Sequence, residues 1–184
     1  MRVAAGAFWA TLETWAGQLL QLGIFVVLSR LLGPEAYGLM GVAILVNACA
    51  DILITGGGWD DALVQRRSLT AAHLSSLFWL VLGGSGLLAG LVALGAAPTA
   101  TLFGAPELVG VMRWLAWQLP LGALAIVPEA LLRREMQFAP LFARRLVALA
   151  IAGGVAIAMA LAGQGVWSLV AFQLVQAAVA AAVL

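Results

Sequence analysis

The stretch LLRREMQFAPLFARR, residues 131–145, carries two pairs of arginines between two long apolar runs. The chain around it is 64% hydrophobic with a mean hydropathy of +1.09, and only 9% of its residues are charged. Soluble domains contain about 25% charged residues. A water-soluble fold of 184 residues cannot bury so much apolar surface, so the excess is expected to face lipid. The composition therefore predicts a membrane protein, with the arginine pairs at the membrane surface.

Six segments of the chain are long and apolar enough to cross a bilayer, which takes about 20 residues and tolerates about 17 to 25. Short stretches with turn-forming residues separate them. The sequence therefore predicts an all-α fold, a polytopic membrane helical bundle that forms a single transmembrane unit over residues 1–184. The predicted helices are residues 8–32, 37–55, 74–97, 113–132, 146–162 and 166–184.

The positions of the arginines predict the orientation, because short cytoplasmic loops are rich in basic residues. With the amino terminus inside, the nine basic residues divide unevenly, and only Arg30 and Arg113 fall on the outer side. We therefore expect a multi-pass protein with a cytoplasmic amino terminus. In this orientation the residues 131–145 form a basic hairpin at the cytoplasmic surface.

Polar side chains recur on one face of the first, second and sixth predicted helices, at spacings of three or four residues. Amides inside a membrane often only join helices, whereas a carboxylate at that depth is costly and commonly marks a transport pathway. Both roles stay open for each amide. We expect these helices to line a substrate cavity with Gln18, Gln21, Asn47, Asp51, Gln173 and Gln176.

The sequence lacks the residue patterns of catalytic and metal sites. Cys49 and His73 are the only residues of their types and have no neighbouring ligand partners. The glycine triplet at residues 56–58 is not followed by the lysine and hydroxyl residue of a phosphate-binding loop. A net charge of +1 gives no argument for a nucleic-acid partner. We therefore expect no enzyme, cofactor, metal site or nucleic-acid binding, and favour transport across a membrane.

Four stretches of the chain resemble the Wzx-type polysaccharide flippases. They are LSRLLGPEAYGLMGVA at residues 28–43, ALVQRRSLTAAHLSSLFWL at 62–80, PEALLRREMQF at 128–138 and GQGVWSLVAFQLV at 163–175. The similarity runs in the same order along essentially the whole chain. More narrowly, the chain resembles the lipopolysaccharide or colanic-acid exporter branch of the multidrug/oligosaccharidyl-lipid/polysaccharide superfamily.

This resemblance implies the amino-terminal, six-helix lobe of a MATE-like flippase, in a protein that continues beyond residue 184 or pairs with another copy. It implies alternating-access transport of undecaprenyl-pyrophosphate-linked oligosaccharide across the bacterial inner membrane, for O-antigen, lipopolysaccharide or other surface polysaccharide. The implied partners are this lipid-linked oligosaccharide, membrane lipids, polysaccharide polymerase and glycosyltransferases. A pyrophosphate headgroup favours arginine contacts, which we expect from Arg30, Arg66 and Arg67.

Two alternatives stay open. A drug or cation antiporter of the same superfamily is expected to carry an acidic residue inside the membrane, as Asp51 does. A membrane scaffold for polysaccharide synthesis, with no transport activity of its own, would use the basic hairpin at residues 131–145 as a docking surface.

Overall fold

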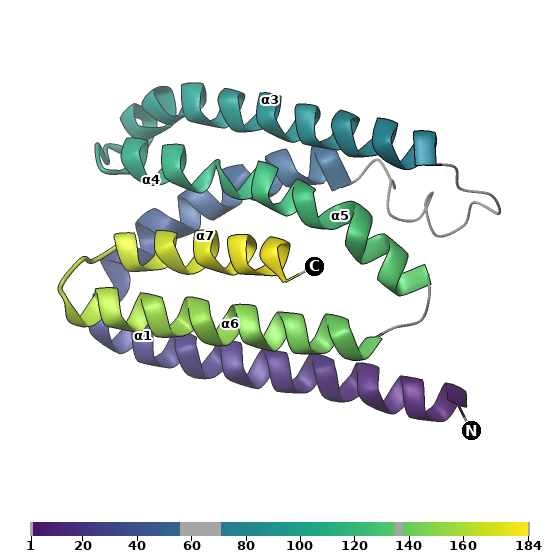
Figure 1. Cartoon of the computed structure of the whole chain (residues 1–184). Coiled ribbons are helices and arrows are strands. Elements are labelled where there is room, and N and C mark those ends of the chain that lie inside the picture. Colours follow the sequence, from purple (N-terminus) through teal and green to yellow (C-terminus); the bar gives the residue numbers. More distant parts are fainter. Residues whose placement is uncertain (1, 56–70, 135–137, 184) are drawn as a thin grey trace.

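The computed structural model describes residues 2–55, 71–134 and 138–183, and within these ranges every regular element is a helix. The predicted fold class, an all-α membrane bundle, is confirmed. Figure 1 shows the helices lying roughly alongside one another. They are α1 (Arg2–Thr55), α3 (Ala71–Phe103), α4 (Leu108–Leu115), α5 (Gln118–Arg134), α6 (Phe138–Leu161) and α7 (Trp167–Ala182).

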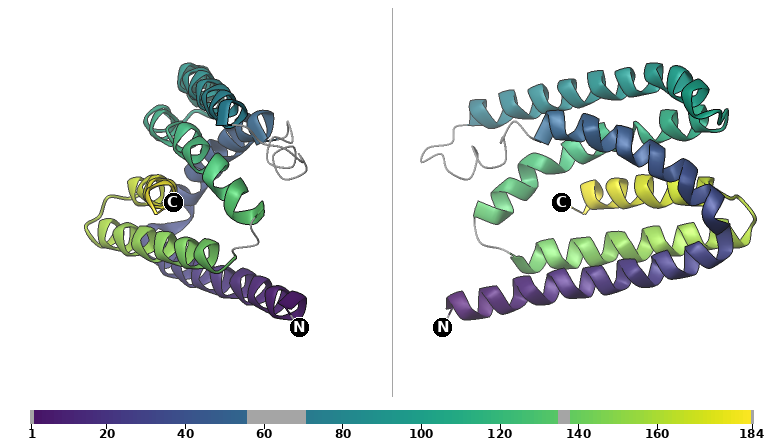
Figure 2. Two further views of the ribbon diagram at one scale, coloured as in Figure 1. Left: turned by 45° about the vertical axis from the view of Figure 1, so that its right-hand side comes forward. Right: turned by 180° about the vertical axis from the view of Figure 1, so that it is seen from behind.

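Helix α1 is bent into two arms at Gly33, whose φ of 75° and ψ of 175° are not helical. A side chain disfavours this positive φ, and glycine has none. Pro34 follows, at the start of the second arm, where its missing N–H costs nothing. The predicted helices 8–32 and 37–55 lie in these two arms, and the loop expected between them is reduced to a kink (Figure 2).

Two aromatic residues join the arms of α1 across the bend. The rings of Phe25 and Tyr37 meet edge to face, with their centroids 5.1 Å apart. The Tyr37 hydroxyl also donates a hydrogen bond to the Phe25 carbonyl at 3.4 Å. Together these contacts fix the angle between the arms, and that angle decides which side chains of each arm face one another.

The first arm of α1 runs parallel to α6. Arg145 lies against Gly17, and Ile24 lies against Gly153, so the contacting residues advance together along both helices. Helix α7 then returns antiparallel to α6 after a turn in which Gly163 and Gly165 have positive φ. Figures 1 and 2 show α7 between α6 and α5. Gln173 of α7 lines cavities inside the bundle.

The other side of the bundle consists of α3 packed on α4 and α5. Helix α3 continues to Phe103, six residues past its predicted end, with Pro98 inside it. The hydroxyls of Thr99 and Thr101 donate to the carbonyls of Gly95 and Pro98, both at 2.8 Å, which keeps these polar side chains bonded to their own helix. Neither threonine therefore needs a polar partner elsewhere.

Four helical segments of the described chain are long and apolar enough to cross a membrane: Gly17–Leu53, Ser75–Phe103, Glu107–Leu132 and Phe142–Leu161. The first contains the bend of α1, the third contains both α4 and α5, and α7 is a shorter apolar helix. Their outward faces are apolar, since Leu94 and Leu102 remain 78% and 81% exposed. Such faces suit contact with lipid, and the chain is a multi-pass membrane protein.

Candidate functional site

The predicted helix 113–132 is interrupted, because α4 ends at Leu115 and α5 begins at Gln118. Pro120 accounts for the break, since it has no N–H to donate to the Ala116 carbonyl four residues earlier. The N–H of Leu119 donates to that carbonyl instead, at 3.2 Å. This three-residue spacing is tighter than that of an α-helix, so the Leu115 carbonyl, the α-helical partner of Leu119, is released.

Asn47, on the second arm of α1, bonds to the released carbonyl. Its Nδ2 donates to the Leu115 carbonyl oxygen at 3.1 Å and to Gln118 Oε1 at 3.4 Å. The residue is buried, with 6% of its surface exposed. A buried carbonyl without a donor costs about 1–3 kcal/mol, so Asn47 makes the break tolerable inside an apolar bundle.

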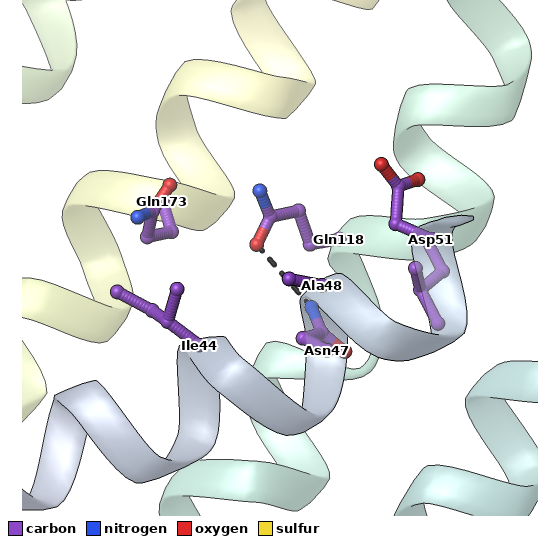
Figure 3. A pocket seen from close by; sticks show the side chains of 7 residues that line it. Ile44, Asn47, Ala48, Asp51, Gln118 and Gln173 are labelled. Carbon is purple, nitrogen blue, oxygen red and sulfur yellow. Dashed lines mark hydrogen bonds between the residues drawn. The ribbon is translucent and has the colours of Figure 1, made fainter. Parts of the chain in front are cut away.

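A cavity of about 210 Å³ lies beside this break (Figure 3). It is formed by the second arm of α1, the start of α5 and the middle of α7. Its walls carry three amides and one carboxylate together with three aliphatic side chains. The lining residues are Ile44, Asn47, Ala48, Asp51, Gln118, Leu119 and Gln173.

A second cavity, of about 240 Å³, adjoins the first, since Ile44 and Gln173 line both. It lies between the two arms of α1 and α7, and its lining is mainly apolar and aromatic, with Phe25 and Phe172 among the wall residues. Gln21 contributes an amide from the first arm. A polar compartment and an apolar one thus lie side by side within the bundle.

The structure brings together four of the six predicted cavity residues. Asn47, Asp51 and Gln173 line the polar cavity, and Gln21 and Gln173 line its neighbour. Gln18 is exposed and Gln176 is half-buried, and neither lines these two cavities.

Of the three arginines predicted to contact the headgroup, the structure describes only Arg30, and Arg30 does not reach the polar cavity. Arg30 is exposed near the bend of α1 and lines neither cavity. Arg66 and Arg67 lie outside the described residues. The described lining of the polar cavity therefore contains a carboxylate and amides but no cation, which suits hydroxyl groups or a cation better than a phosphate.

Gln118 is a site residue that the sequence prediction missed. It hydrogen-bonds Asn47, which lies 71 residues earlier in the chain, and it lines the cavity. The available signal was an amide two residues before a proline inside an apolar run. This signal is weak, because proline is tolerated within membrane helices.

Within the arginine pair at residues 144–145, Arg144 is packed more deeply than a surface anchor, whereas Arg145 is exposed. Arg144 Nη2 bonds Glu129 Oε2 at 2.7 Å, with 11% and 27% of the two side chains exposed, and this ion pair ties α6 to α5. The Arg144 atoms Nε and Nη1 are buried without a hydrogen-bond partner. Arg145 lies over Gly17 of α1. These arginines therefore join three helices at one end of the bundle.

Comparison with known proteins identifies the family. Residues 27–184 match the sequence profile of a family described as polysaccharide biosynthesis protein. The chain belongs to this family. The resemblance to Wzx-type flippases that the four sequence stretches carry is thereby confirmed at the family level.

Two curated relatives of this family member are similar over most of the chain. The succinoglycan biosynthesis transport protein ExoT of Rhizobium meliloti (strain 1021) is 34% identical over 157 residues, which cover 83% of this chain and 31% of the relative. The lipopolysaccharide biosynthesis protein WzxC of Escherichia coli (strain K12) is 25% identical over 142 residues, 74% of this chain and 28% of that protein. The chain thus spans about a third of the length of these relatives. No solved structure matches it significantly.

Proposed function

We propose that this chain is one lobe of a transporter that moves lipid-linked oligosaccharide across the bacterial inner membrane for surface polysaccharide or lipopolysaccharide synthesis. The carrier lipid in this proposal is undecaprenyl pyrophosphate, and the transport mode is alternating access. The observation that carries the proposal is a polar cavity, lined by Asn47, Asp51, Gln118 and Gln173, within the apolar helical bundle of a polysaccharide biosynthesis family member.

The polar lining supports transport because amides and carboxylates at membrane depth are costly unless they face a partner or a wet pathway. A saccharide has many hydroxyl groups and needs hydrogen-bonding partners along its route through the bilayer. The second arm of α1, α5 and α7 supply such groups from three directions. The apolar cavity beside them, with Phe25 and Phe172, offers a surface for the lipid part of the cargo.

In this proposal, arginines outside the polar cavity bind the negatively charged pyrophosphate of the carrier lipid. Arg30, near the bend of α1, together with Arg66 and Arg67, is proposed to contact the pyrophosphate. In the proposed orientation the amino terminus is cytoplasmic. A second lobe, of the same protein or another copy, completes the pathway, and polysaccharide polymerase and glycosyltransferases act with the transporter.

The test uses a strain in which the complete gene is deleted. Lipid-linked oligosaccharide on the inner leaflet and polysaccharide at the cell surface are both quantified. Accumulation inside with loss outside, reversed by the intact gene, is the expected result. Normal amounts of both would overturn the proposal.

The carboxylate of Asp51 in the cavity is the observation that favours a second candidate, a drug or cation antiporter. The same deletion strain separates the two functions, because an antiporter would change sensitivity to cationic drugs and leave surface polysaccharide intact. A scaffold without transport activity would instead lose binding of a cytoplasmic partner when residues 131–145 are altered. The names of the two relatives, both polysaccharide biosynthesis proteins, favour the first function.

A further inference from the structure

We propose that Gln118 is the cavity residue that donates a hydrogen bond to a sugar hydroxyl of the cargo, and that Asn47 is a positioning residue that orients the Gln118 amide. This inference rests on the proposed function, which supplies a saccharide cargo. It differs from the sequence prediction, in which Asn47 itself touches the substrate.

The amide nitrogen of Asn47 is fully engaged within the protein. Only 6% of its surface is exposed. Both hydrogens of its Nδ2 are used, one on the Leu115 carbonyl and one on Gln118 Oε1. Its Oδ1 is buried. Asn47 therefore has no donor or exposed acceptor left for a ligand, although it lies in the cavity wall.

The bonds of Asn47 decide how Gln118 is oriented. The Leu115 carbonyl can only accept a hydrogen bond, so Asn47 must turn its NH₂ group toward it. The second hydrogen of this group then needs an acceptor, which must be Oε1 of Gln118. The Nε2 of Gln118 consequently lies on the far side of its amide, away from Asn47, as Figure 3 shows. The break in the helix thereby fixes a pair of N–H donors in the cavity.

The surroundings of Gln118 match a sugar ring better than a phosphate. In Figure 3 Gln118 lies between the amide of Gln173 and the carboxylate of Asp51. Donors and acceptors thus alternate along the wall, and a sugar hydroxyl both donates and accepts. The described lining residues include no cation for an anionic group. A volume of about 210 Å³ is below the about 300–1,000 Å³ of pockets that enclose a whole ligand, which indicates a subsite for one ring.

A purely structural role for Gln118 makes a different prediction. If its amide only fastens the broken helix to α1, the Oε1 that accepts from Asn47 is all that matters. Gln118→Glu keeps an oxygen at that position and has nearly the same shape. It replaces the cavity-facing N–H donors by an acceptor. The substitution therefore separates donation to a ligand from support of the fold.

The experiment measures equilibrium binding to the purified full-length protein in lipid nanodiscs. The probes are undecaprenyl pyrophosphate carrying one hexose and the same lipid without sugar. Gln118→Glu should weaken binding of the hexose-bearing lipid by about tenfold and leave binding of the bare lipid within about twofold of wild type. Gln164→Glu makes the same chemical change at an exposed position in the α6–α7 turn and should alter neither affinity.

Asn47→Asp supplies an independent test of the positioning role. It keeps the size of the side chain but has no N–H to donate, so Gln118 is expected to turn its Nε2 toward residue 47 and its oxygen toward the cavity. The same selective loss for the hexose-bearing lipid should follow. Thermal unfolding of each variant in nanodiscs checks that the protein remains folded.

The outcomes are distinct. Selective loss of the hexose-bearing lipid in either folded variant supports the inference. Equal loss for both lipids, or no loss for either, removes Gln118 as the sugar contact and leaves the proposed function intact. Failure of the wild-type protein to bind either lipid overturns the proposed function and the inference with it.

Discussion

The amide nitrogen of Asn47 lies 3.1 Å from the carbonyl oxygen of Leu115, so the second arm of α1 is bonded to the broken end of α4. Leu115 is completely buried and Asn47 nearly so. Without this bond a carbonyl would be left unpaired among apolar side chains. The bond therefore couples the shape of the cavity wall to the stability of the helix break.

Replacing Asn47 with alanine should lower the free energy of unfolding by about 1–3 kcal/mol, because the Leu115 carbonyl would lose its donor. Denaturation in detergent, followed by circular dichroism, measures this change. Gln164→Ala in the exposed α6–α7 turn is the control and should be neutral. Equal stability of Asn47→Ala and wild type would mean that the carbonyl needs no side-chain partner.

Replacing Pro120 with alanine should reduce export while the protein remains folded in the membrane. The new N–H can donate to the Ala116 carbonyl and allow a continuous helix, in which Leu119 pairs with Leu115 and Asn47 loses its partner. Slower hydrogen exchange of the amides near residue 119, with less surface polysaccharide, is the expected result. Pro128 lies inside α5 without a break, so Pro128→Ala is the matched control. If both variants export normally, the break has no functional importance.

Hydrophobic pattern and turn residues were sufficient to predict the helical bundle, since most of each predicted segment lies in a helix, although 113–132 is divided between α4 and α5. They could not predict which proline interrupts a helix. Pro98 and Pro128 lie within α3 and α5, whereas Pro120 lies next to a break. The difference depends on whether a side chain from elsewhere, here Asn47, bonds the released carbonyl.

The cavity was predicted in part, for a similar reason. Gln18 and Gln21 share the polar face of the first arm, yet only Gln21 lines one of the two cavities described. Helical spacing predicts which residues share the polar face of the first arm. The bend at Gly33 and the position of α7 decide which part of that face meets the other helices. Gln118 was missed because its role depends on a contact with α1 rather than on its own spacing.

Substituting Gly153 with alanine should destabilise the protein by about 1–3 kcal/mol through overpacking. A Cβ at this position would lie 2.5 Å from Ile24 Cδ1, so the Ile24 side chain would have to leave its position or α1 and α6 would have to move apart. Gly154→Ala is the control, because nothing lies within 4 Å of a Cβ there. Unfolding in detergent measures both variants. Because Ile24 is itself buried, the double variant Gly153→Ala/Ile24→Ala should lose less stability than the sum of the two single losses, and an additive loss would argue against this contact as the cause.

The loss of stability on breaking the ion pair between Arg144 and Glu129 should depend on which partner is replaced. Glu129→Gln leaves the mostly buried charge of Arg144 without its carboxylate, and is expected to cost about 1–3 kcal/mol. Arg144→Met removes the buried charge together with its unpaired Nε and Nη1 groups, and should cost less. Arg113→Met, at an exposed position of α4, is the control. The order of the unfolding midpoints tests this argument, and the reverse order would contradict it.

Replacing Asp51 with asparagine should lower export by at least about tenfold, which corresponds to a free-energy difference of about 1.4 kcal/mol. The amount of protein in the membrane should stay constant. The substitution keeps the size of the side chain but removes the carboxylate charge from the cavity wall. Such a charge within a membrane-spanning segment is costly, and we propose that the Asp51 carboxylate responds to a coupling ion. Surface polysaccharide and an immunoblot of membranes are measured together, with Glu107→Gln in the exposed α3–α4 turn as the control. Unchanged export would remove Asp51 from the transport mechanism and leave the amides of Gln118 and Gln173 as the polar groups that act on the cargo.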